Sequence, residues 1–360
     1  MIKILIANLL FLLSIVMLNA QSILDNNPYI IDLGGEVRIA ENFNNFTNVP
    51  SQFNYIHTEL LLLNNMSYDF TAKLLVEATY NSLDTSLNKY EQLGEFYIGF
   101  EHNSFGNLFF GRTPSIYYNG YSAGWLDNGY IYNKTILDAE YLGAVLGTRN
   151  PDNTLYYSHI FKNLKIATQI SGKSNKLKFN STLDIERVFG AGANAVIAFG
   201  PLNVGIGYLF SSLKQSNNTA SEQVLNNYKS QIFNTGAKFD FSGIYTALSL
   251  DWGVSRWDIN NDSFGVNYII MYDYGDNHLG FIPQIGYGYL RHSGKSAYLS
   301  NNQISIGMSY YFSNNFNLFL DSNWDIRTTH QRNVTNHNTK DLLSVKKKNI
   351  FLIGLGYSFY

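Results

Sequence analysis

The stretch that decides the fold is the last one, residues 346–360, which read KKKNIFLIGLGYSFY. Bulky apolar side chains alternate there with smaller ones. Successive side chains of a strand point to opposite faces, so one face should be apolar and the other small or polar. The apolar face would carry Phe351, Ile353, Leu355, Tyr357 and Phe359. The second face would carry Leu352, Gly354, Gly356 and Ser358. The pattern predicts a strand with one face toward lipid and one toward water.

The same period of two recurs through the chain, for example over residues 67–80, 279–289, 302–312 and 316–327. Charged residues make up only 14 % of the chain and aromatic residues 16 %, while the mean hydropathy is −0.13. After residue 20 no run of 18 apolar residues occurs that could form a spanning helix. A chain that crosses a membrane without helices must close into a barrel, because only closure pairs every backbone group.

Connections of two lengths separate the expected strands. Short ones fall at residues 64–66, 103–104, 201, 242, 276–277 and 314–315, and long ones at 42–51, 81–92, 113–152, 215–227 and 331–345. This asymmetry is typical of bacterial barrels, whose short turns face the periplasm. We expect an all-β, transmembrane antiparallel β-barrel of 16 strands. Eighteen strands are possible, because residues 177–187 could be a strand or part of a loop.

The first 20 residues have the pattern of a secretory signal peptide. Lys3 precedes an apolar segment, Ile4 to Leu18, and the small residues Ala20 and Ser22 follow it. We expect cleavage after Ala20, with cleavage after Ser22 as the alternative, and a barrel domain over residues 21–360. A membrane anchor is disfavoured because the run is short and no positive flank follows it.

Several other classes of protein are disfavoured by what the chain contains. The net charge of −2 gives no support for nucleic-acid binding, and there is no cysteine. The seven histidines fall in no nucleophile elbow or metal-binding spacing, so we expect neither an enzyme nor a metal or other cofactor. Residues 190–193, Gly-Ala-Gly-Ala, superficially suggest a nucleotide loop, but no P-loop lysine follows and we expect a turn.

Residues 95–112, EFYIGFEHNSFGNLFFGR, resemble the general (trimeric) Gram-negative outer-membrane porins. In that family a tight turn leads into Phe-Gly-x-x-x-x-Gly-Arg, and a long third loop follows at once. The resemblance resumes at residues 154–171, 191–211 and the last strand. It implies an outer-membrane homotrimer, in contact with lipid and lipopolysaccharide, that passes small hydrophilic solutes passively. It also implies that the third loop folds into the lumen, where loop acids face arginines of the wall.

The resemblance suggests residues for such a constriction. Arg112 occupies the place of the family's wall arginine, although it could simply pair with a loop carboxylate. The loop offers Asp127 as the first choice of acid, besides Asp138 and Glu140, but lacks the family's Pro-Glu-Phe-Gly-Gly-Asp run. On the second strand, His57 beside Glu59 stands where the family often has an inward arginine. Inward Arg38 would then supply positive charge; otherwise these are ordinary lumen-facing polar residues.

Two other functions stay open. Tyrosines of the third loop could form a binding track in a substrate-specific channel, or the long loops could make the barrel a surface adhesin or scaffold. Lys346, Lys347 and Lys348 could hold lipopolysaccharide phosphates, although a solvated positive rim is the simpler interpretation.

Overall fold

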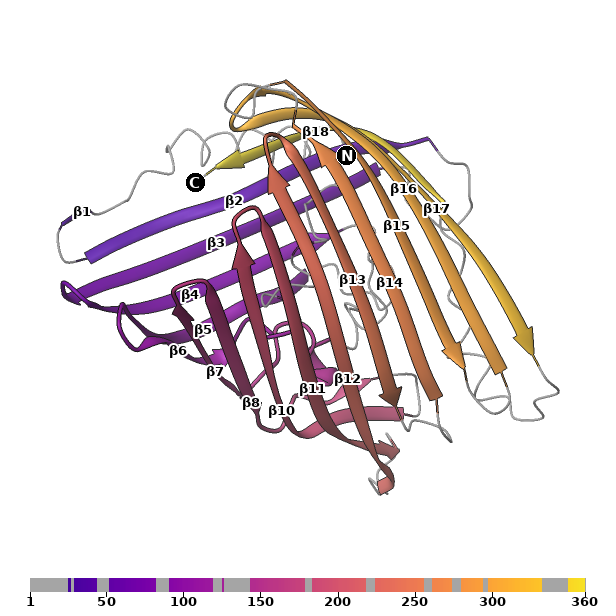
Figure 1. The fold of residues 1–360 in the computed structure, drawn as a ribbon, viewed down its shortest axis with the longest axis horizontal. Helices are drawn as coiled ribbons and strands as arrows, with labels where there is room; N and C mark the ends of the chain where they lie inside the picture. The colour runs from indigo at the N-terminus through magenta and orange to yellow at the C-terminus, as the bar shows by residue number, and fades with distance from the viewer. Residues whose placement is uncertain are drawn as a thin grey trace, which may run out of the picture.

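The computed structural model describes residues 25–26, 29–43, 52–81, 91–118, 125, 143–178, 183–217, 224–255, 261–273, 280–293, 297–331 and 349–359. They form a single antiparallel sheet that closes on itself into a barrel (Figure 1). Sixteen long strands make up the wall. They are β2 (Tyr29–Asn42), β3 (Gln52–Ser67), β4 (Phe70–Asn81), β5 (Glu91–His102), β6 (Gly106–Arg112), β7 (Thr154–Phe161), β8 (Leu164–Ser171), β10 (Leu183–Phe199), β11 (Leu202–Asn217), β12 (Val224–Phe241), β13 (Ile244–Ser255), β14 (Asn261–Tyr272), β15 (Gly280–Ser293), β16 (Ala297–Ser313), β17 (Phe316–Gln331) and β18 (Ile350–Phe359). Within these described ranges no helix is long and apolar enough to cross a membrane.

The last strand closes the barrel by pairing with the first long strand. In Figure 1 the yellow β18 lies beside the indigo β2, and their register runs from Leu352 opposite Asn42 to Phe359 opposite Gly35. Alternation along β18 is confirmed: Leu355 is 48 % exposed on the outer face, whereas Leu352 is buried on the inner one. Phe359 keeps the outward register, but its ring packs over Gly35 and is buried.

The segment of uncertain assignment resolves in favour of 16 strands. Leu177–Lys178 form the two-residue strand β9, which pairs with Asp184 and Ile185 at the start of β10. Residues 183–187 belong to β10, and residues 179–182 lie outside the described residues. A second two-residue strand, β1 (Asp25–Asn26), extends the start of β2. Residues 190–193 are likewise part of β10, so the predicted turn there is wrong.

Tight connections gather on one rim of the barrel, which we call the turn rim; the opposite rim is the loop rim. The turn between β12 and β13 uses Ser242 and Gly243 with φ of 51° and 81°, the two left-handed residues of a type I′ hairpin. One predicted turn is misplaced, because β3 continues through residues 64–66 to Ser67 and the turn follows at 68–69. Most of the strands have 10 to 18 residues, which is long enough to span a bilayer when tilted; β6, β7 and β8 are shorter, with 7, 8 and 8 residues.

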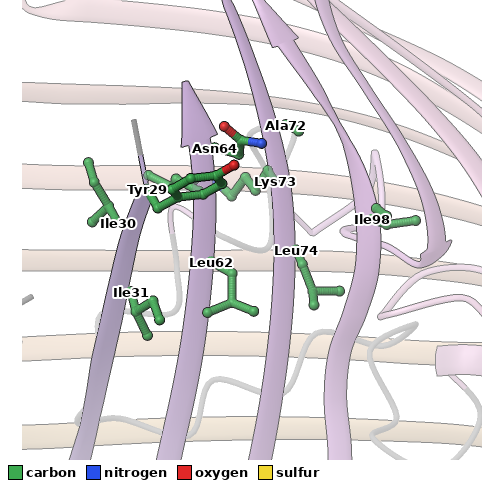
Figure 2. Close-up of a pocket in the computed structure, with 10 residues that line it drawn as sticks. Tyr29, Ile30, Ile31, Leu62, Asn64, Ala72, Lys73, Leu74 and Ile98 are labelled. Atoms are coloured by element: carbon green, nitrogen blue, oxygen red, sulfur yellow. The ribbon is translucent and has the colours of Figure 1, made fainter. Parts of the chain in front are cut away.

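The outer face is apolar and carries aromatic side chains at the turn rim, where amphipathic rings suit a membrane interface. The exposed examples are Tyr68, Phe105, Phe161, Phe199, Phe241 and Phe312. Figure 2 shows a shallow apolar groove of about 430 Å³ on this outer face, where side chains of β2 to β5 such as Ile31, Leu62, Leu74 and Ile98 lie side by side.

Candidate channel constriction

The loop that follows β6 turns inward and runs along the inner wall. The backbone N–H of Ile116 donates to Oε1 of Gln169 on β8 at 2.9 Å, and Nδ2 of Asn194 on β10 donates to the Ile116 carbonyl at 2.6 Å. Glycine at position 192 leaves room for this contact, because a Cβ there would lie 2.5 Å from Cδ1 of Ile116. The first limb of the loop is therefore seated on β8 and β10.

Farther along the loop, Trp125 packs against a part of the wall formed by β13 and β14. The hydroxyl of Tyr245 on β13 donates to the Trp125 carbonyl at 2.5 Å. The Trp125 side chain packs against buried Ala247 and Ile269 of β13 and β14, and Nζ of Lys238 lies 6.0 Å from its ring. The described parts of the loop thus contact the wall from β8 to β14.

The loop returns to the wall through the short helix α3 (Gly143–Leu146) and Gly147. The hydroxyl of Ser115 donates to the Gly147 carbonyl at 2.8 Å, tying the two limbs of the loop together. The hydroxyl of Ser211 on β11 donates to the Leu146 carbonyl at 2.6 Å. The expectation that the long third loop folds into the lumen is confirmed.

This loop position divides the inner wall into a covered part and an open part. Inward side chains of β7 to β14 are almost completely buried, as Tyr156 (3 %), Gln169 (1 %) and Ile232 (2 %) illustrate. Charged inward side chains of β2 to β4 keep partial exposure, for example 21 % for His57 and 22 % for Glu77. We call the inner face of β2 to β5 the open wall, because water reaches its polar side chains.

A row of charged residues crosses the open wall at one level. Glu59 on β3 is directly paired with Glu77 on β4. A β-bulge between Val76 and Ala78 brings Glu95 of β5 to the same level, where its backbone N–H donates to Oε2 of Glu77 at 2.7 Å. We call Glu59, Glu77 and Glu95 the acidic row. Side by side on three neighbouring strands, these acids place negative charge on the open wall at Glu59 and Glu77, with the more buried Glu95 beside them.

The positively charged Arg112 lies near the acidic row, within electrostatic range of Glu77. Strict alternation would place it on the outer face with Phe110, which is 57 % exposed. Gly111 interrupts the alternation because its φ of 138° falls in a region that other residues rarely adopt. Nη1 of Arg112 lies 3.7 Å from Oδ1 of Asp152, and the guanidinium is within electrostatic range of Glu77 and Arg149.

The remaining charges of the open wall are mostly paired. Arg38 forms a bidentate pair with Glu36, with Nε to Oε1 at 2.6 Å and Nη2 to Oε2 at 2.8 Å. Lys73 lies 3.1 Å from Glu101, and Nδ1 of His57 lies 3.4 Å from Oε1 of Glu77. Pairing with Glu36 leaves Arg38 little net positive charge to offer the lumen.

The structure brings together three of the residues suggested by the sequence. Glu59 is a member of the acidic row on the open wall, His57 lies next to Glu77 of that row, and Arg112 is within electrostatic range of Glu77. Arg38 is on the same wall but engaged with Glu36. Asp127, like Asp138 and Glu140, lies outside the described residues.

Sequence reasoning missed two acids as site residues. Period-two alternation already put Glu77 on the watery face, so a comparison of neighbouring strands could have placed it next to Glu59. The same alternation puts Glu95 on the inner face with Tyr97, and the pairing of Val76 with Phe96 puts Glu95 next to Glu77. Among the described residues no cluster of His, Cys, Asp or Glu could hold a metal ion.

A closed antiparallel barrel with a loop folded inside it and an exposed charged wall defines a membrane channel of the β-barrel class. The sequence model described as Gram-negative porin matches residues 31–341, so the chain belongs to the Gram-negative porin family. It is a general, non-enzymatic porin channel for diffusion in the outer membrane.

Solved structures share this fold at low sequence identity. Salmonella typhi OmpF aligns with a TM-score of 0.68 and 16 % identity over 93 % of this chain and 99 % of its own. In-vitro folded OmpT of Vibrio cholerae gives 0.67 and 16 % over 94 % and 100 %. An anion-selective porin from Comamonas acidovorans gives 0.62 and 11 % over 92 % and 100 %. A search of curated proteins found no match.

Proposed function

We propose that this porin is a cation-preferring diffusion channel for small hydrophilic solutes, narrowed between the open wall and the third loop. The observation that carries the proposal is the acidic row. Among the described residues, Glu59 forms no ion pair, and the ion pair of Glu77 is with His57 alone. Glu59 and Glu77 therefore present negative charge to the lumen, with the more buried Glu95 beside them.

Elementary electrostatics links this arrangement to ion preference. Two unit charges 4 Å apart in water interact by about 1 kcal/mol, and low-dielectric walls strengthen the interaction. A cation passing the acidic row is favoured by this amount and an anion is disfavoured. The positive charges of Arg112 and Arg149 lie to one side of the acidic row. The Arg149 guanidinium lies 5.0 Å from the Tyr118 ring. Acids on one side and arginines on the other would orient dipolar solutes.

The constriction residues of this proposal are the acidic row, His57, Arg112 and, through its pair with Glu36, Arg38. Planar-bilayer recordings of the purified protein in a KCl gradient test it. We expect stepwise conductance and a reversal potential of the sign given by a cation-selective pore. An anion-selective potential would refute the ion preference. Saturable block by one solute would favour the substrate-specific channel, and absence of conductance would favour the adhesin.

We further propose that the assembled form is a homotrimer in contact with outer-membrane lipid and lipopolysaccharide. OmpT of Vibrio cholerae, which shares the fold, has been solved in a trimer form. Heat-sensitive migration in detergent gels, together with chemical cross-linking, should reveal a species of three chains. A single-chain species under all mild conditions would contradict this.

Residues 1–20 are proposed to be a signal peptide that is removed on export, and residues 21–360 the mature barrel. N-terminal sequencing of protein extracted from outer membranes would place the cut after Ala20 or, as the alternative, after Ser22. A mature protein that begins at Met1 would exclude cleavage.

A further inference from the structure

Arg187 is a buried charged residue on β10, in the part of the inner wall that the third loop covers, and it is not a member of the acidic row. Arg187 on β10 is 0 % exposed, and all three nitrogens of its guanidinium donate hydrogen bonds to backbone carbonyls. Nε donates to Gly172 at 3.0 Å, and Nη2 to Asp152 at 2.6 Å. Nη1 donates to Ala144 at 2.5 Å and to Val145 at 3.3 Å. A charged group this deeply buried needs such partners to offset its lost hydration.

The wall is shaped around this side chain. A register shift between Arg187 and Phe189 inserts one extra residue into β10. The backbone N–H of Arg187 then donates to Oγ of Ser174 at 2.8 Å, and its carbonyl accepts from the Ser174 N–H at 2.9 Å. Gly190 completes the seat, since a Cβ there would lie 3.0 Å from Cδ of Arg187.

The carbonyls that Arg187 holds belong to two functionally different segments. Ala144 and Val145 are in α3, on the returning limb of the third loop, and Val145 packs into a buried cluster with Ile185 and Leu213. Asp152 is the residue whose carboxylate faces Arg112 near the acidic row. One guanidinium therefore connects the wall, the loop and the arginine side of the constriction.

We propose that Arg187 is the positioning residue that fixes the third loop against the wall and thereby sets the width of the channel. It acts through Ala144, Val145 and Asp152 and does not itself touch the permeating solute. The proposal concerns the place of the loop, so it holds whichever ion the channel prefers. Arginine suits the task because its planar fork directs several donors at once, whereas lysine offers a single point charge.

The absence of cysteine from the chain allows a clean reporter of the loop. Val145→Cys places a small, apolar thiol at a position that is 3 % exposed. In this background Arg187→Gln should speed labelling by a water-soluble maleimide at least about tenfold, the loss expected for one hydrogen bond to a charged donor. Single-channel conductance should rise with it, and Arg187→Lys should fall between the two proteins.

Lys165→Gln is the matched control, since it removes one positive charge from the inner face of β8, the strand next to β10. It should change neither labelling nor channel width. The thermal unfolding midpoint of each barrel separates release of the loop from loss of the fold. Unchanged labelling and conductance in a folded Arg187→Gln barrel would overturn the proposal.

Should Arg187→Gln fail to assemble, Arg187→Lys and Gly190→Ala carry the test. The added methyl at position 190 would press on Cδ of Arg187 at 3.0 Å without removing its charge. Faster labelling in either assembled variant supports the positioning role. Labelling as slow as in the Val145→Cys parent in both would refute it.

Discussion

Replacing Glu77 by glutamine removes the central charge of the acidic row while keeping its hydrogen bond. The side-chain carbonyl of glutamine can still accept the N–H of Glu95, which now donates to Oε2 of Glu77 at 2.7 Å. Volume and polarity are preserved, so the barrel should fold as before. What changes is the electrostatic potential between Glu59 and Glu95, and the charge that faces His57 at 3.4 Å.

The size of the effect follows from Coulomb's law. A carboxylate about 4 Å from a passing ion contributes about 1 kcal/mol in water. That energy corresponds to about a fivefold change in a concentration ratio. We expect the cation-to-anion permeability ratio to fall about two- to fivefold in 0.1 M salt, where the Debye length is about 10 Å. In 1 M salt, where it is about 3 Å, the difference should shrink.

Reversal potentials of purified channels in a KCl gradient measure this ratio. Asp262→Asn is the matched control, because it removes the same charge from an exposed outward position near the loop rim. A Glu77→Gln channel with normal conductance and an unchanged reversal potential would show that ions do not pass the acidic row. Replacing Glu59, Glu77 and Glu95 together should shift the channel toward anions, since Arg112 and Arg149 remain.

Other substitutions probe separate parts of the structure. Neutralising Arg112 to Gln should move the reversal potential further toward cations, and an unaltered potential would remove this residue from the constriction. Gly111→Ala should lower the yield of assembled barrel or shift its selectivity. The φ of 138° disfavours alanine, and the added methyl would lie 2.4 Å from the Phe96 carbonyl oxygen. Normal folding and normal selectivity of this variant would contradict the prediction. Ile206→Lys, on an outer position that is 54 % exposed, should cost about 2–4 kcal/mol of folding free energy in lipid, by urea titration.

Period-two alternation was enough to predict the barrel, the pairing of apolar and polar faces, and the inward side of β18, because each depends only on local geometry. Alternation failed as a guide at positions where a glycine or a β-bulge interrupts the strand. Arg112 departs from the alternation because the φ of Gly111 interrupts it, and Arg112 pairs with Asp152. Arg187 lies beside a β-bulge, whose register no single strand reveals.

The glycine-rich run at residues 190–193 was misread for a related reason. Gly190 and Gly192 suggested a turn, but both lie inside β10, where the missing side chains admit Arg187 and Ile116. A glycine in a strand often marks a close approach by another part of the chain. Which part approaches depends on contacts between segments more than 70 positions apart, such as Asn194 and Ile116.

Gly190 and Gly192 of β10 bear on the width of the channel and not on the charge of its lining. Gly192 leaves room for Ile116 of the third loop, and Gly190 leaves room for Arg187, which holds the loop in place. A methyl group added at position 192 would collide with Ile116 of the loop, and one added at position 190 would press on Arg187, which holds the loop; neither position belongs to the acidic row. Pore size and ion preference can therefore vary independently, and a size filter can be retuned by substitutions hidden from every permeating molecule.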